Sequence, residues 1–408
     1  MATIIIFMSI TLILLLTSLA MTVFRKYRKS GLRLLAGLIL IEIIAAFYVY
    51  TPRKYNRAYI SHSEEWGRLG LRSLADSLDF YLGCIPSGNA VVQAAFGNNF
   101  NSITPENALK MGPLLQHFEI GRYDFTEADK IVDEAISRNL RVRGHTLIWG
   151  KQSDFFKSPD LALYLEKYPD NERGNILLGI MENHITTVLD HFKGRVTVWD
   201  VVNEPMSIIR GGRLENNVFH RYLGEDYIAV AFRLARNADP GIKLYLNENF
   251  LSYDGKQARA FLSLLKKMKA DNVPIDGVGI QSHLSPADSS FADLEKFMKS
   301  ITDLGFEVEI TELDFRLRLF GAAEDPYEEQ GRYYGRLLSV CLDNPKCRGI
   351  TFWGFSDNDC WMDKMPLFFP KPNEPYMFDS RMNPKPVFHE FYRILASKVK
   401  ARSLHHGN

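Results

Sequence analysis

The chain lacks the compositional features of several functional classes. Its 49 Lys and Arg residues nearly balance 48 Asp and Glu residues, so the formal net charge is only +1 over 408 residues. Nothing in this balance favours a nucleic-acid partner. Four cysteines are too few for a disulfide scaffold. No His-Glu-x-x-His segment or similar metal-ligand spacing occurs, so we predict neither a metal nor another cofactor.

Internal repeats and low-complexity tracts are also absent, and no glycine-rich phosphate-binding fingerprint follows a strand-like segment. The missing fingerprint argues against a doubly wound nucleotide-binding sheet. What remains is ordinary globular composition, with 46% hydrophobic and 24% charged residues. This composition and length suffice for one large domain.

Two long apolar runs lie at the start of the chain. Residues 3–24 carry no charge, and residues 34–50 carry only Glu42. At about 1.5 Å per residue, a helix of the first run would span a bilayer of about 30 Å, and the second run is within the range for a span. We therefore predict that residues 1–50 form a helical hairpin that anchors the chain in a lipid bilayer.

The connector between the runs is basic, from Arg25 to Arg33. The positive-inside rule places it in the cytoplasm and the rest of the chain outside. A cleaved N-terminal signal followed by secretion is the alternative, although no basic segment precedes Ile4. A single uncleaved anchor, with residues 34–50 lying at the membrane interface, is a third arrangement.

Residues 51–63 are a polar spacer, residues 64–397 alternate apolar strands with amphipathic helices, and residues 398–408 are a tail. The alternation predicts a parallel sheet with crossover helices. Eight such units in roughly 330 residues match a (β/α)8 TIM barrel. The predicted strands are 80–85, 101–104, 141–147, 196–202, 242–247, 277–281, 307–311 and 349–353.

Function in barrels of this kind lies at the carboxyl ends of the strands. Polar and aromatic residues follow the predicted strands there, and they are mainly carboxylates, amides and tryptophans. Such a set without a metal suits sugar chemistry. In chain order they are Glu106, Asn107, Lys110, His145, Trp149, Gln152, Asn203, Glu204, Asn247, Glu248, Gln281, His283, Glu312, Asp314, Trp353 and Trp361.

Two glutamates at strand ends stand out. Glu204 and Glu312 each follow a buried strand, and either one alone could be a capping or ion-paired carboxylate. As a pair on nearly opposite strands they fit glycoside hydrolysis, which needs one protonated acid and one ionised carboxylate. In retaining enzymes the two carboxyl groups are about 5–5.5 Å apart. Each raises the pKa of the other, so one stays protonated near neutral pH.

Residues 199–205 and 310–314, which contain these glutamates, resemble the two signature segments of glycoside hydrolase family 10, the endo-β-1,4-xylanases. Four further segments resemble family motifs in the family's order, namely 101–110, 143–149, 279–283 and 351–354. The resemblance runs from about residue 64 to 396. It implies retaining endo-hydrolysis of the β-1,4-xylosidic linkages of xylan.

The resemblance also implies roles for individual residues. Glu204 would be the acid/base, Glu312 the nucleophile, and Asn203 the partner of the 2-hydroxyl of the sugar being cleaved. His283 would hold the nucleophile, with Gln281 beside it. The same subsite would be lined by His145, Trp149, Gln152 and Trp361. The next sugar would be bound by Glu106, Asn107, Lys110 and Trp353. Without the motifs, a core histidine or core tryptophan is an equal or better interpretation of several of these.

The chain departs from the family pattern near the expected cleft. Gly150 and Lys151 stand where the family has His-Ser, Met111 where a tryptophan often stands, and residues 366–370 where the family often ends in Asp. Some family members carry a disulfide at the position of Cys341 and Cys347, so the resemblance implies that pair, with two reduced thiols as the alternative. Two other functions stay open: hydrolysis of a β-1,4-glucan by the same mechanism, and non-catalytic xylan binding, which would not require the acid.

Overall fold

The barrel consists of eight parallel strands that close in chain order, with β1 paired to both β2 and β8. The computed structural model describes residues 70–86, 94–150, 161–207, 211–283, 290–366, 368–369 and 371–406. The strands are β1 Tyr81–Cys84, β2 Ser102–Ile103, β3 Arg141–Trp149, β4 Val198–Asn203, β5 Lys243–Glu248, β6 Gly277–Ile280, β7 Glu307–Leu313 and β8 Cys347–Phe352. Each overlaps a predicted strand, so the predicted TIM barrel is confirmed.

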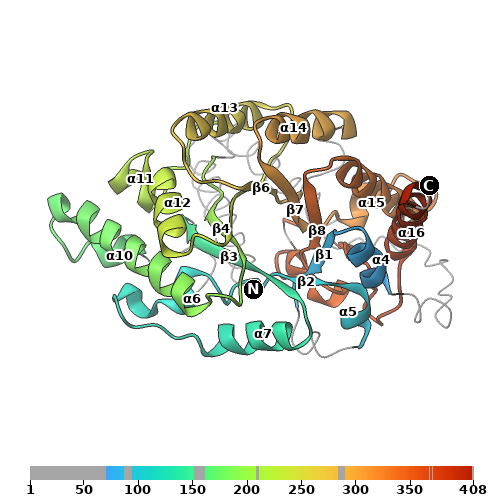
Figure 1. The fold of residues 1–408 in the computed structure, drawn as a ribbon, viewed down its shortest axis with the longest axis horizontal. Helices are drawn as coiled ribbons and strands as arrows, with labels where there is room; N and C mark the ends of the chain where they lie inside the picture. Colours follow the sequence, from blue (N-terminus) through green and yellow to red (C-terminus); the bar gives the residue numbers. More distant parts are fainter. Residues whose placement is uncertain are drawn as a thin grey trace, which may run out of the picture.

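Helices surround the barrel on its outer face (Figure 1). Those described are α4 Leu71–Ser77, α5 Ala94–Asn99, α6 Met111–Leu114, α7 Thr126–Ser137, α9 Leu161–Leu165, α10 Asp170–His191, α11 Val218–Leu223, α12 Tyr227–Ala238, α13 Lys256–Ala270, α14 Phe291–Asp303, α15 Pro326–Asp343 and α16 Pro386–His406. Their apolar residues recur at helical spacing. In α12, for example, Tyr227, Ala231 and Ala235 are buried, which turns one stripe of the helix toward the sheet.

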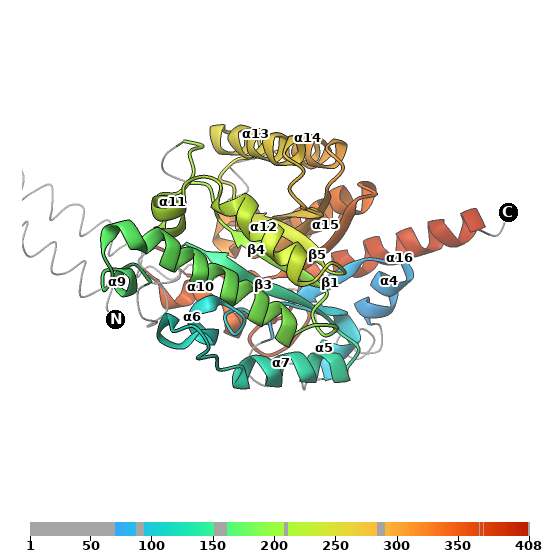
Figure 2. The same ribbon diagram turned by 60° about the vertical axis from the view of Figure 1, so that its left-hand side comes forward.

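Helix α16 continues to His406, through most of the segment that the sequence assigned to a tail. Figure 2 shows it extending beyond the barrel wall. No proline or glycine occurs between residues 387 and 406, so nothing in that stretch breaks the helix.

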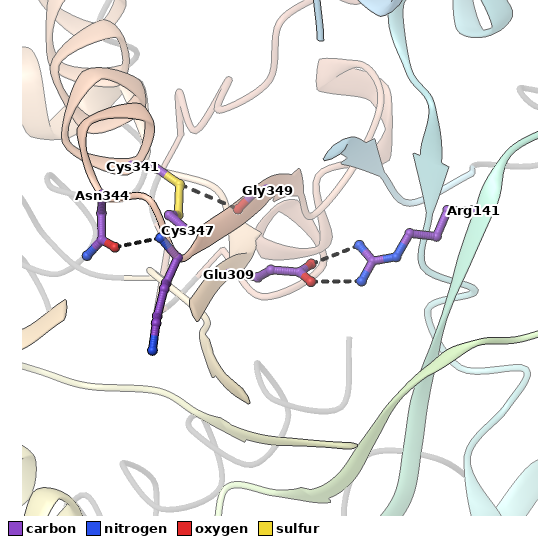
Figure 3. Close-up of a disulfide and its surroundings, with 7 residues drawn as sticks. Arg141, Glu309, Cys341, Asn344, Cys347 and Gly349 are labelled. Atoms are coloured by element: carbon purple, nitrogen blue, oxygen red, sulfur yellow. Dashed lines mark hydrogen bonds and ion pairs between the residues drawn. A yellow bond between two sulfur atoms is a disulfide. The ribbon is translucent and has the colours of Figure 1, made fainter. Parts of the chain in front are cut away.

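The amino-end half of the barrel interior holds a buried ion cluster. Arg143 pairs with Asp200 and, at 3.1 Å, with Glu309. Arg141 donates to both oxygens of Glu309 at 2.8 and 3.1 Å (Figure 3). These four side chains come from β3, β4 and β7, so the cluster ties together strands that are distant in sequence.

A disulfide joins Cys341, near the end of α15, to Cys347, at the start of β8, with Cα atoms 5.4 Å apart (Figure 3). This is the pair that the resemblance implied. It closes a short loop at the amino end of β8. Cys84 and Cys360 are free and buried.

The predicted membrane hairpin of residues 3–24 and 34–50, and the spacer after it, lie outside the described residues. Within the part of the chain that is described, no helix combines the length and hydrophobicity needed to cross a bilayer.

Candidate active site

A cleft of about 620 Å³ opens at the carboxyl ends of the strands. Most of the predicted site residues line it: Glu106, Asn107, Lys110, His145, Trp149, Asn203, Glu204, His283, Glu312, Trp353 and Trp361. Gln281 is buried and bonds to Glu204. Gln152 lies outside the described residues.

Glu204 follows the last residue of β4 in a left-handed backbone conformation, with φ of 51°. Its N–H still bonds to the carbonyl of Asn247 at 2.9 Å. Non-glycine residues in this conformation are strained and gather at functional sites. The half-buried carboxylate accepts from Trp149 Nε1 at 3.2 Å and from Gln281 Nε2 at 3.1 Å. Both of these donors are neutral.

Glu312 lies on β7 and is only 4% exposed. Its Oε1 accepts from Asn247 Nδ2 at 2.7 Å, and its Oε2 lies 3.1 Å from His283 Nε2. Each oxygen of the Glu312 carboxylate therefore has a hydrogen-bond donor.

His283 belongs to a hydrogen-bonded chain of three side chains, His283, Asp314 and Trp361. His283 Nδ1 lies 2.7 Å from Asp314 Oδ1, and Trp361 Nε1 donates to Asp314 Oδ2 at 2.7 Å. Burial lowers the pKa of His283, but Asp314 and Glu312 outweigh it and raise the pKa to about 10. His283 is therefore an imidazolium at neutral pH and donates to a carboxylate from each ring nitrogen.

A network of amides fixes the orientation of Asn203. Its Oδ1 accepts from Asn247 Nδ2 at 2.9 Å and from Gln281 Nε2 at 3.1 Å. Its own Nδ2 is thereby the donor that this side chain offers to the cleft. Thr311 Oγ1 bonds to Asn247 Oδ1 at 2.7 Å and sets the orientation of that amide in turn.

Gly279, which pairs with Asn247 across β5 and β6, leaves the space for this network. A Cβ at Gly279 would collide with Asn247 Oδ1. Asn247 and Asp314 were recognised in the sequence only as strand-end polar residues and not as site residues. Their position at strand ends was the signal that could have identified them, but the family resemblance assigned a role to neither residue.

A hydrogen bond to Asp200, beneath the cleft, fixes the orientation of His145. Its Nδ1 lies 2.9 Å from Asp200 Oδ2, and Asp200 also pairs with Arg143. Burial of Asp200 opposes ionisation, but Arg143 and His145 outweigh it and lower its pKa. Asp200 is therefore ionised and holds the His145 ring, which packs edge-on against Trp353 with centroids 5.3 Å apart.

Lys110 is 5% exposed and lines the same cleft as both glutamates. Its Nζ donates to Asn107 Oδ1 at 2.8 Å and lies 4.5 Å from the centroid of the Trp149 ring. Burial lowers the pKa of Lys110, against the opposing effect of the nearby carboxylates. Among the described residues, no group of three or more His, Cys, Asp or Glu has the geometry to hold a metal.

The family model for glycosyl hydrolase family 10 matches residues 74–394. The chain belongs to this family. It is 32% identical over 340 residues to endo-1,4-beta-xylanase B of Thermotoga neapolitana, and the matched region covers 81% of this chain and 93% of the relative. It is 35% identical over 299 residues to exoglucanase XynX of Acetivibrio thermocellus, covering 71% of this chain and 26% of that protein. The crystal structure of xylanase 10B from Thermotoga petrophila RKU-1 in complex with xylobiose matches with a TM-score of 0.71 at 32% identity, covering 81% and 98% of the two chains.

Two departures of this family 10 glycosidase from the usual pattern have structural explanations. A Cβ at Gly150 would collide with the side chain of Asn217, so Asn217 occupies the space beside this position. In the segment after Trp361, Met365 and Phe369 line the wall of the cleft. The third departure, Met111, is fully buried and contributes to the core rather than to the cleft.

Proposed function

We propose that the chain is a retaining endo-β-1,4-xylanase in which Glu204 is the acid/base and Glu312 the nucleophile. One observation carries this assignment: the two carboxylates share a cleft but have different partners. Glu312 receives a hydrogen bond from the cationic His283 and another from Asn247. Glu204 receives hydrogen bonds from the neutral donors Trp149 and Gln281. A cationic hydrogen-bond donor stabilises the negative charge that a nucleophilic carboxylate carries.

In the first step, an Oε atom of Glu312 attacks the anomeric carbon while Glu204 gives its proton to the leaving glycosidic oxygen. The bond from the carbon to that oxygen breaks, and a glycosyl ester of Glu312 forms. In the second step, Glu204 takes a proton from water, and the water oxygen displaces Glu312 from the same carbon. Two displacements leave a β-configured product and restore both glutamates.

Asn203 offers its Nδ2 to a sugar hydroxyl, which we assign as the 2-hydroxyl beside the bond being cleaved. A hydrogen bond there that strengthens in the transition state lowers the barrier. His145, Trp149 and Trp361 complete the subsite; the role of Gln152 stays an expectation from the family motif. Glu106, Asn107, Lys110 and Trp353 bind the next sugar.

Xylan is the proposed substrate because a xylanase with bound xylobiose shares this fold over 81% of the chain. Hydrolysis of a β-1,4-glucan by the same mechanism is the second candidate, favoured by the similarity to an exoglucanase. Glucose units carry a hydroxymethyl group that xylose lacks, so the space near Trp353 and Trp361 decides between them. A receptor that only binds xylan would need no proton donor at Glu204.

The test is reducing-sugar release from xylan and from a β-1,4-glucan by the full chain and by Glu204→Gln and Glu312→Gln. We expect release from xylan and a loss of about 10³-fold or more in each variant, because each loses a reacting group. Wild type that releases nothing from either polymer would rule out the hydrolase. Full activity of Glu312→Gln would rule out the nucleophile assignment, and an α-anomer as first product, followed by NMR, would rule out retention.

We also propose that residues 3–50 anchor the enzyme in a lipid bilayer with the barrel outside the cytoplasm, because a basic connector separates two apolar runs. Secretion after cleavage of an N-terminal signal is the alternative. In untreated cells the full chain should sediment with membranes. Protease added to intact cells should degrade the barrel. Recovery of a shortened, soluble protein from the medium would support cleavage, and a protected barrel would rule out the proposed orientation.

A further inference from the structure

The short segment that follows β6 holds both glutamates of the cleft. Gln281 Nε2 donates to Glu204 Oε1 at 3.1 Å, and His283 Nε2 lies 3.1 Å from Glu312 Oε2. Ser282 stands between these two residues in the sequence and is 1% exposed. The backbone at Ser282 therefore sets how the neighbouring side chains are directed toward the two carboxylates.

Ser282 has a left-handed backbone conformation, with φ of 63°. This conformation is disfavoured for a residue with a Cβ and persists where surrounding contacts hold it. The residue before it is fixed by backbone bonds: the N–H of Gln281 donates to the carbonyl of Glu248, and its carbonyl accepts from the N–H of Glu312, both at 3.0 Å. The chain is thus anchored up to Gln281, and the turn at Ser282 then decides where the His283 ring lies.

A buried hydrogen bond reaches this turn from outside the cleft. The hydroxyl oxygens of Ser282 and Tyr253 lie 3.1 Å apart. Tyr253, in the connection between β5 and α13, is 8% exposed, and its ring stacks on Phe297 of α14 with centroids 5.9 Å apart. Burial raises the pKa of Tyr253, so its hydroxyl keeps the proton at neutral pH. The bond therefore connects the turn to the surrounding layer of helices.

Resting on the proposed function, we propose that Tyr253 and Ser282 are positioning residues for both reacting glutamates. Their hydrogen bond holds the left-handed turn that directs Gln281 toward the acid/base and His283 toward the nucleophile. Neither hydroxyl-bearing residue is among those that line the cleft. Each acts through its neighbours rather than on the sugar.

The first measurement is kcat and KM on xylan for the full chain, Tyr253→Phe, Ser282→Ala and the double variant. Each single substitution removes one hydroxyl and leaves the other buried without this partner. We expect kcat to fall about tenfold in each single variant, with KM within about twofold of wild type, because the reacting groups lose alignment while the cleft walls stay. The double variant should also fall about tenfold rather than about a hundredfold, because both substitutions remove the same interaction.

The pH profile of kcat/KM gives a readout that a general loss of stability would not move. Its acidic limb reports protonation of the proposed nucleophile, Glu312, in the free enzyme. In Tyr253→Phe the cationic ring of His283 is less well aligned with this carboxylate, so the pKa of Glu312 should rise. We expect the acidic limb to move to higher pH by about half a unit.

Ser282→Gly separates the turn from the hydroxyl. Glycine adopts a positive φ without the cost that a Cβ brings, so its turn depends less on Tyr253, and we expect kcat about threefold above that of Ser282→Ala. Tyr123→Phe is the matched control. Its hydroxyl donates to Asn183 Oδ1 at 3.0 Å and the residue does not line the cleft, so kcat, KM and the pH profile should stay at their wild-type values.

Wild-type kcat in both single variants, additive losses in the double variant, or an unmoved acidic limb would overturn the proposal and leave the xylanase activity standing. An equal fall in Tyr123→Phe would also overturn it, because the loss would then follow from removing any buried hydroxyl. A kcat for Ser282→Gly no higher than that of Ser282→Ala would overturn the role of the turn. Failure of wild type to cleave xylan would instead overturn the proposed function, so the two failures are distinguishable.

Discussion

Two sets of carboxylates lie in the same barrel and are compensated in different ways. Toward the amino ends of the strands, Asp200 and Glu309 face Arg143, and Arg141 adds a second guanidinium to Glu309. At the carboxyl ends, the cleft glutamates face mainly amides, a tryptophan and one histidine. Arginine does not release its proton in proteins, so the inner carboxylates stay ionised.

The proposed acid/base, Glu204, needs the opposite property. A carboxylate that gives and takes a proton must be held by groups that do not lock its charge, and neutral amide and indole donors meet this need. Asp200 connects the two regions because it pairs with Arg143 and orients His145 at the cleft. The comparison therefore predicts that changes in the inner cluster act on stability, whereas changes in the cleft act on catalysis.

The largest expected effect is that of Arg143→Met. Asp200 and Glu309 would remain buried without their shared cation, which costs about 3–5 kcal/mol. Denaturant unfolding should report this loss. Arg332→Met, which removes an exposed pair with Glu329, should change the free energy of unfolding by no more than about 0.5 kcal/mol. A loss for Arg143→Met as small as that of the control would show that the inner cluster is not held by charge.

His283→Gln tests the cleft side. The variant loses the cation beside Glu312, and we expect kcat to fall about 10²–10³-fold with a smaller change in KM, because the lost interaction is electrostatic. Steady-state kinetics on xylan measures both. His191→Gln is the matched control, since His191 bonds to Asp129 at 2.8 Å and does not line the cleft. An equal fall in both variants would contradict a specific role for His283.

The pH dependence of stability separates the two regions further. The pKa of His283 rises from an ordinary value near 6.5 to about 10 in the folded protein, so its contribution to stability is complete below about pH 6.5 and is lost as the pH rises through 10. Between pH 7 and pH 9, wild type should lose about 2 kcal/mol of unfolding free energy that His283→Gln does not lose. Identical slopes in the two proteins would mean that the ring is neutral. Arginine in the inner cluster adds no slope in this range.

The smallest expected effect is that of the double variant Cys341→Ser with Cys347→Ser. The disulfide closes a loop with a sequence separation of only 6, and its loss should cost about 1–2 kcal/mol. Thermal unfolding with and without reductant measures this cost. Because the bond lies at the amino end of β8, kcat should not change. A large fall in kcat would show that the amino ends of the strands affect catalysis in the cleft as well as stability.

The strands were predictable because a parallel sheet is buried on both faces and its strands are continuous apolar runs. All six residues of β4 are buried, for example. The glutamates were predictable because charge appears where such a run stops. The residues that hold the glutamates were less predictable. Asn247 contacts Glu312 and Asn203, but its sequence neighbours do not distinguish it from an ordinary amide at a strand end.

The sequence by itself determined the barrel, the family and the positions of Glu204 and Glu312, because motif order and the end of each apolar run are local features. Only the tertiary structure decided which side chains hold each glutamate. The partners of Glu312 come from β5 and from the segment after β6, and those of Glu204 come from β3 and from the first residue after β6. Closure of the barrel brings these donors together, and hydrogen bonds and the charge on His283 then set the difference between the two carboxylates.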